Sequence, residues 1–186
     1  ALRLMPVVET VRAPDRGGWG RARELIRQRR SRWLLSLIII IRAPAALITI
    51  LLQPMLLDLG AQASDLVAFN IFWTMSASAV GAVLAGLAIK RFGGAWAVYP
   101  LLVLTALLCA GLSQVVEAGA VFWAKALVAA MWFAGSYALV LMYQLFLRNS
   151  GEGYGGFDFT FFVTIDTLIA LIMSPLGALM ADQIGV

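Results

Sequence analysis

Residues 33–57 read WLLSLIIIIRAPAALITILLQPMLL, an apolar run of 25 residues that contains one charged side chain, Arg42. A helix needs about 20 apolar residues to cross the roughly 30 Å of hydrocarbon in a bilayer. An open sheet would leave backbone N–H and C=O groups unpaired in lipid. The run therefore predicts a membrane-spanning helix.

Four further apolar runs of similar length follow along the chain. They cover residues 66–89, 95–116, 120–147 and 159–181, and only short connections separate them. Short connections place neighbouring helices next to one another and antiparallel. We predict an all-α fold, a polytopic membrane helix bundle with five transmembrane helices, over residues 33–186.

The composition supports this class and excludes several chemistries. Apolar residues make up 62% of the chain and charged residues 13%, against about 45–50% and 25% in soluble domains. A bilayer must therefore cover part of the surface. Histidine is absent and Cys109 is the one cysteine, which excludes internal disulfides, Cys/His zinc sites and Ser-His or Cys-His catalysis. We expect no enzyme, no cofactor and no metal site.

The basic residues are distributed unevenly about the five runs. Twelve of the fourteen fall on the side of the N-terminal segment, whereas the opposite connections carry only Asp58, Asp65, Glu117 and Asp182. This pattern predicts a multi-pass protein of a bacterial inner membrane with a cytoplasmic N-terminus. The same pattern indicates that the basic residues, which give the chain its net charge of +4, contact anionic lipid rather than nucleic acid. The twelve are Arg3, Arg12, Arg16, Arg21, Arg23, Arg27, Arg29, Arg30, Arg32, Lys90, Arg91 and Arg148.

Residues 1–32 form a basic segment ahead of the first run. Trp19, Leu25, Ile26 and Trp33 recur at roughly helical spacing among the arginines. Two interpretations stay open. The segment is either an amphipathic helix on the inner membrane surface or a solvated basic linker.

Three ionisable residues lie inside the runs, where a charge costs about 2.5–3.5 kcal/mol. Arg42 and Asp166 both lie some two turns in from the inner side, so they could pair or share a substrate site. Lys125 lies near the outer end of the fourth run. The alternatives are a structural ion pair and, for Lys125, a side chain that extends to the interface.

Helix breakers and polar residues accompany these charges. Pro44, Pro54 and Pro175 interrupt two of the runs, and such residues either free carbonyls toward a cavity or merely kink the helix. Small residues recur in the second run, with Ala77, Gly81 and Ala85 in one row and Ala82 and Gly86 in another, which predicts close helix packing. Further candidates for a cavity wall are Gln53, Asn70, Tyr137 and Gln144.

The connection between the second and third runs resembles a known family motif. Residues 86–93, GLAIKRFG, are similar to the G-x-x-x-D-R-x-G-R loop of the major facilitator superfamily in its second-half copy. Lys90 stands where the family often has Asp, and no basic residue follows Gly93. The resemblance implies that Gly86 permits close packing and that Lys90, Arg91 and Gly93 belong to an inner gating loop.

The same resemblance extends over most of the chain. The five runs would be helices seven to eleven of a twelve-helix transporter, a partial major-facilitator fold. Arg42, Lys125 and Asp166 would then lie on helices that line the cavity, and the uncharged third run would face lipid. Two short stretches, residues 53–60 and 156–160, also resemble the muropeptide and siderophore-import permeases of this superfamily.

The resemblance implies half of a secondary active transporter. It would move a polar or amphiphilic solute by alternating access, with Asp166 as the expected proton-coupling residue and with the N-terminal half or a partner membrane chain completing the path. The alternative is a non-transporting assembly or interaction subunit with the same fold.

Overall fold

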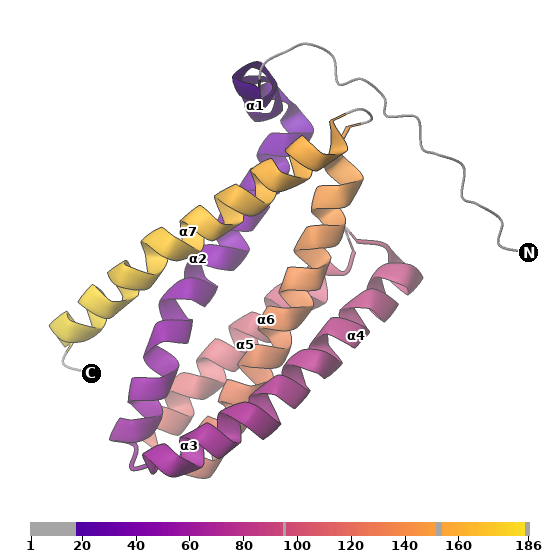
Figure 1. The fold of residues 1–186 in the computed structure, drawn as a ribbon. Coiled ribbons are helices and arrows are strands. Elements are labelled where there is room, and N and C mark those ends of the chain that lie inside the picture. Colours follow the sequence, from indigo (N-terminus) through magenta and orange to yellow (C-terminus); the bar gives the residue numbers. More distant parts are fainter. Residues whose placement is uncertain (1–17, 95, 152–153, 185–186) are drawn as a thin grey trace, which may run out of the picture.

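The computed structural model describes residues 18–94, 96–151 and 154–184, and this part of the chain is helical except for short connections (Figure 1). Its helices are α1 (Gly18–Arg27), α2 (Arg29–Asp58), α3 (Ala63–Phe69), the π-helical turn η1 (Asn70–Thr74), α4 (Met75–Phe92), α5 (Val98–Glu117), α6 (Val121–Asn149) and α7 (Gly155–Ile184).

Among the described residues, five helices are long and apolar enough to cross a membrane. They are α2, the continuous helix α3–η1–α4 over Ala63–Phe92, and then α5, α6 and α7. The predicted all-α bundle with five membrane-crossing helices is confirmed, and the chain is a multi-pass membrane protein. The first membrane-crossing helix, α2, starts at Arg29, four residues before the apolar run. Its backbone hydrogen bonding continues through the arginines that precede residue 33.

Helix α6 lies at the centre of the bundle. It packs against α2, α4, α5 and α7, while the most extensive contacts join α4 to α6 and α2 to α7. Figure 1 shows α2 and α7 on one side of α6 and α4 on the other, with α5 behind α6. Helix α5 contacts mainly α6 and exposes Val103 and Leu107, which agrees with the expectation that the uncharged run is peripheral.

Two glycines set the closest helix contacts. A Cβ atom at Gly81 would lie 2.3 Å from the carbonyl oxygen of Phe133 on α6, and one at Gly177 would lie 2.9 Å from the carbonyl oxygen of Leu47 on α2. The predicted packing of small residues is therefore confirmed for the row of Gly81 and Ala85. It is wrong for Gly86, where a Cβ would meet nothing within 4 Å, because this residue faces away from α6.

The second membrane-crossing helix contains a feature that the sequence analysis did not predict. Residues Asn70–Thr74 form one π-helical turn between α3 and α4. In a π turn the backbone hydrogen bonds span five residues instead of four, so the turn accommodates one extra residue. The hydroxyl of Thr74 donates to the carbonyl oxygen of Asn70 within this turn.

The basic segment before α2 is a helix rather than a solvated linker over Gly18–Arg27. Figure 1 looks almost down the axis of α1, whereas α2 and α7 extend across the view, so α1 lies across the end of the bundle. Its Leu25 is fully buried in the core, while Trp19 is 92% exposed. The arginines Arg3, Arg12 and Arg16 lie outside the described residues.

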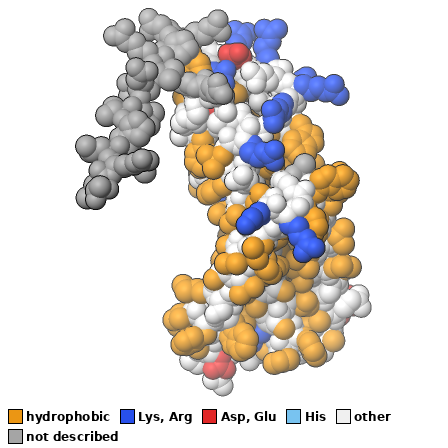
Figure 2. All heavy atoms as spheres, turned by 90° about the vertical axis from the view of Figure 1, so that its right-hand side faces the viewer, with side chains coloured by type: hydrophobic (Ala, Val, Ile, Leu, Met, Phe, Trp, Pro, Cys, Tyr) orange, Lys and Arg blue, Asp and Glu red, His pale blue; other side chains and the backbone are white. Residues whose placement is uncertain are grey.

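Charges of opposite sign mark the two ends of the bundle. We call the end that carries α1, Arg29, Lys90, Arg91 and Arg148 the basic end. The opposite turns carry Asp58, Asp65 and Glu117 and form the acidic end. On the face shown in Figure 2, most lysine and arginine side chains lie above a largely hydrophobic lower surface.

Candidate functional site

Arg42 and Asp166 form an ion pair between α2 and α7. The Nε atom of Arg42 lies 2.9 Å from Oδ1 of Asp166, and the two side chains are 32% and 7% exposed. The N–H direction does not complete a regular hydrogen bond, so the contact is mainly electrostatic. The pairing expected from their matched depth is confirmed. What the pair does functionally stays a prediction.

The prolines of α2 leave backbone acceptors near this pair. The helix runs without a break through Pro44 and Pro54, and because proline has no N–H, the carbonyls of Ile40 and Ile50 lose their usual donors. Both of these residues line the cavity described next. The residues that lose these donors are therefore cavity-lining residues, and a functional role of the prolines stays a prediction.

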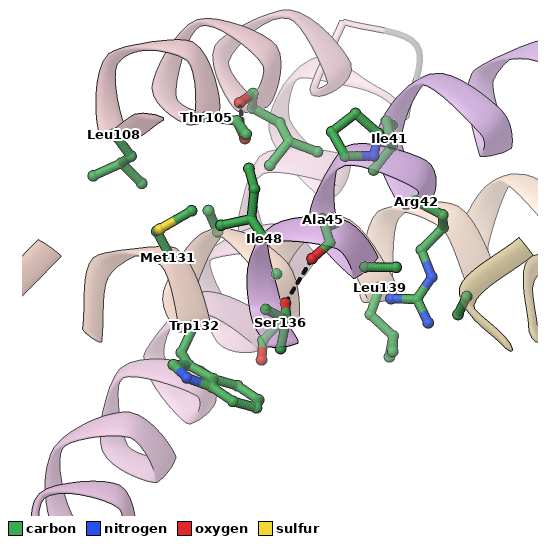
Figure 3. Close-up of a pocket in the computed structure, with 18 of the residues that line it drawn as sticks. Ile41, Arg42, Ala45, Ile48, Thr105, Leu108, Met131, Trp132, Ser136 and Leu139 are labelled. Carbon is green, nitrogen blue, oxygen red and sulfur yellow. Dashed lines mark hydrogen bonds between the residues drawn. The ribbon is translucent and has the colours of Figure 1, made fainter. Parts of the chain in front are cut away.

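A cavity of about 520 Å³ lies between α2, α5 and α6, and α7 contributes Ala170 and Ser174 (Figure 3). Arg42 lies at its edge. The wall is largely aliphatic, and two of its hydroxyls are already engaged. Thr49 donates to the carbonyl of Ala45 at 2.6 Å, and Thr105 donates to that of Leu101 at 2.9 Å. The cavity thus combines an apolar wall with one cation at its margin.

Three further candidates lie away from the Arg42–Asp166 pair, toward the acidic end. Gln53 and Asn70 line a smaller cavity of about 280 Å³ between α2, the second membrane-crossing helix and α6. Lys125 lies in the first two turns of α6, whereas the α6 residues that share the main cavity with Arg42 begin at Met131. The structure does not bring these three residues to the ion pair.

Tyr137 and Gln144, both on α6, also lie outside the main cavity. The hydroxyl of Tyr137 donates to the carbonyl of Ala97 at 3.3 Å, so it ties α6 to the start of α5. Gln144 is half-buried and lines neither of the two cavities described above. A role for either residue in a solute path stays a prediction.

The residues of the expected gating loop end α4 and form the turn to α5. Gly93 has φ +83°, a backbone conformation that favours glycine. Lys90 and Arg91 lie in the last turn of α4, where cations complement the helix dipole. Neither takes part in an ion pair within the described residues. The gating role stays a prediction.

A second ion pair, which the sequence analysis missed, fastens α1 to the start of α7. Arg21 donates from Nε to Oδ1 of Asp158 at 2.9 Å and from Nη2 to Oδ2 at 2.6 Å. The backbone N–H of Gly151 also donates to Asp158 at 2.9 Å, and the ring of Tyr154 lies 4.7 Å from the guanidinium carbon. Asp158 is fully buried.

The geometry of this second pair is that of a strong anchor. Two parallel hydrogen bonds from a guanidinium to a carboxylate are charge-assisted and directional. The hydrogen bonds to Asp158 raise the pKa of Arg21, so the guanidinium stays charged. A Cβ at Gly151 would lie 2.8 Å from Nη2 of Arg21, so a side chain at this turn would displace the guanidinium. The signal in the sequence that could have indicated this pair was an acidic residue at the start of a helix, on the same predicted side of the membrane as the arginine-rich segment.

The described residues contain no group of three or more His, Cys, Asp or Glu side chains that could hold a metal ion. Comparison of the chain with protein-family models, with curated proteins and with solved structures found no significant match.

Proposed function

We propose that this chain is part of a secondary active transporter of the major-facilitator type in a bacterial inner membrane, with its N-terminus in the cytoplasm. In this proposal the chain supplies helices seven to eleven, and another segment or chain supplies the opposite half. One observation carries the proposal: Arg42, which is paired with Asp166, lines a cavity of about 520 Å³ within a membrane-crossing bundle. Ionisable groups within membrane helices are costly and are commonly functional.

The pair suggests how a proton and an anionic solute could be coupled. While Asp166 is ionised, it neutralises Arg42 across 2.9 Å. A proton that binds to the carboxylate removes that compensation and leaves the guanidinium free to hold an anionic group of the solute. Release of the proton restores the ion pair and displaces the solute. Proton and anion then bind together, which is the requirement for symport.

The wall of the cavity narrows the class of solute. Aliphatic side chains from α2, α5 and α6 surround most of the space, and the cation lies at one margin. This arrangement suits a molecule with one anionic group and an apolar body. Such an amphiphilic solute would pair with Arg42 and bury its apolar part against the wall.

The proposal is tested by uptake into proteoliposomes that contain the complete assembly. The probe is labelled octanoate, measured with and without an inward proton gradient. Arg42→Ala is expected to abolish uptake of the transported probe. Asp166→Asn is expected to abolish the dependence on the gradient while exchange of solute across the membrane continues, because a neutral side chain imitates the protonated state.

A matched control is Glu117→Gln, which removes a carboxylate at the acidic end, from the last residue of α5, while the ion pair joins α2 to α7. This variant is expected to transport at the normal rate. Full gradient-driven uptake by both Arg42→Ala and Asp166→Asn would remove the proposed site.

A second candidate is a non-transporting assembly subunit with the same fold. The observation that favours it is that Asp166 already neutralises Arg42, so the pair needs no solute to complete it. A stable complex with a partner membrane chain that carries no flux of proton or solute would favour this role.

A further inference from the structure

An open groove of about 1040 Å³ lies between α4 and α5, with Phe133 and Tyr137 of α6 as its floor. Its walls are mainly aliphatic and aromatic. The hydroxyl of Tyr137 is satisfied by the carbonyl of Ala97, so it adds no free polar group to the floor. The apolar side chains that form the walls include Leu84, Leu87, Ala88, Pro100 and Leu104.

The length and position of the groove match those of a lipid chain. On α4 the lining residues extend from Leu84 to Phe92, which corresponds to about 12 Å along a helix axis. One leaflet of a bilayer has a hydrocarbon depth of about 15 Å. The groove begins at the basic end and extends toward the middle of the bundle, as one leaflet does.

Three basic side chains lie at the basic end of the groove. Arg91 lines the groove, and Lys90 precedes it in the same helical turn. Arg148 reaches toward the connection that follows α4, where its Nη1 would lie 3.9 Å from a Cβ at Gly94. None of the ion pairs among the described residues involves these three side chains. They form a cluster of positive charge without an acidic partner within the described part of the chain.

Aromatic side chains accompany the cations at this end. Trp96 and Tyr99 lie with their ring centroids 5.7 Å apart, and both line the groove and are mostly exposed. Tryptophan and tyrosine are enriched where lipid headgroups meet the hydrocarbon. The cations and the aromatic pair therefore lie at the level expected for a headgroup, next to an apolar slot.

We propose that this groove is a binding site for an anionic phospholipid. One acyl chain lies between α4 and α5 on Phe133, and the phosphate is held by Arg91 with help from Lys90 and Arg148. Charge complementarity selects this occupant over a hydrophobic helix of another chain, because a helix would leave the three cations unpaired. The inference does not depend on the proposed transport activity.

The headgroup contact is tested by native mass spectrometry of the full chain in detergent, titrated with palmitoyl-oleoyl phosphatidylglycerol or with the matching phosphatidylcholine. The anionic lipid is expected to bind at least tenfold more tightly. Arg91→Gln is expected to weaken its binding about fivefold. The control Arg29→Gln removes the same charge at the basic end but outside the groove, and it is expected to leave the affinity unchanged.

The acyl-chain contact is tested by filling the slot while the cations remain. Ala88→Trp on α4 and Leu104→Trp on α5 are each expected to lower phosphatidylglycerol binding more than tenfold. Two variants on opposite walls are used so that one remains informative if the other melts early in a thermal scan.

Three results would overturn the proposal. Arg91→Gln and Arg29→Gln could weaken binding equally, which would indicate general attraction to the basic end. Phosphatidylcholine could bind as tightly as phosphatidylglycerol. A homodimer that forms only when lipid is removed, and that is lost in both tryptophan variants, would assign the groove to a second copy of the chain.

Discussion

Asp158 and Asp166 lie about two turns apart on α7, and each carboxylate pairs with an arginine from the first part of the chain. Asp158 binds Arg21 of α1, and Asp166 contacts Arg42 of α2. The α1–α2 segment is thus joined to α7 at two levels, one at the basic end and one within the membrane-crossing part. The two pairs differ in form, since the first is bidentate and the second is a single contact.

The deeper pair makes a prediction about stability. Arg42→Ala or Asp166→Asn alone is expected to lower the free energy of unfolding, by about 3 kcal/mol for Arg42→Ala, because that change leaves the Asp166 carboxylate without its cation. The double variant is expected to lose less than the sum of the two single losses, since neither charge then remains unpaired. Thermal or denaturant unfolding in one detergent measures all four proteins. Strictly additive losses would mean that the two side chains do not interact.

The close contact of α4 with α6 makes a second prediction. Gly81→Ala is expected to destabilise the protein by about 1–3 kcal/mol, because the added methyl group would meet the Phe133 carbonyl and force the two helices apart. Gly86→Ala is the matched control on the same helix. It is expected to leave stability unchanged or raise it by up to about 1 kcal/mol through helix propensity. Unfolding in detergent distinguishes them, and equal effects would contradict the observed orientation of α4.

The anchor at Asp158 makes a third prediction. Arg21→Ala is expected to release α1, so that the backbone amides of Gly18–Arg27 exchange with deuterium at least tenfold faster. Arg23→Ala is the control, since Arg23 is exposed on the same helix. Exchange in the middle of α6 is expected to stay slow in both variants. Unchanged protection of α1 in Arg21→Ala would show that Leu25 alone holds the helix in place.

The separation of charge between the two ends makes a fourth prediction, about topology. In a Cys109→Ser background, single cysteines are introduced as Asp58→Cys, Glu117→Cys and Lys90→Cys. A membrane-impermeant maleimide applied to intact cells is expected to label the first two and not the third, because basic ends remain cytoplasmic. Labelling of Lys90→Cys together with Asp58→Cys on intact cells would contradict the proposed crossing of the membrane.

The architecture could be predicted from the sequence because the bilayer imposes a simple constraint on it. Every helix that crosses hydrocarbon needs a long apolar run, so the five runs located the five helices, and only their ends differed from the structure. The start of α2 at Arg29 was missed because hydropathy reports lipid contact and not backbone hydrogen bonding. A helix that continues into the polar interface leaves no signal in an apolar run.

The candidate site could be predicted only in part. The distance of each residue from the start of its helix was enough to place Arg42 opposite Asp166, because α2 and α7 both start at the basic end and run in the same direction. Depth alone does not give the rotation of a helix about its axis. Tyr137 consequently faces the groove rather than the main cavity, and Gly86 faces away from α6. The pair of Asp158 with Arg21 was not predicted because the two residues are 137 positions apart in the sequence and neither lies inside an apolar run between charged neighbours of known depth.

The π turn at Asn70–Thr74 acts as a phase shift in the second membrane-crossing helix. From the last residue of the turn onward, Thr74, Gly81 and Ala85 are the buried positions, while their predecessors Trp73, Val80 and Leu84 are exposed. If the same residues formed regular α-helix through this turn, every later side chain would be advanced by about 100°. Val80 would then replace Gly81 against the Phe133 carbonyl, where not even a methyl group fits. This single π turn therefore determines which face of the apolar helix α4 packs against α6.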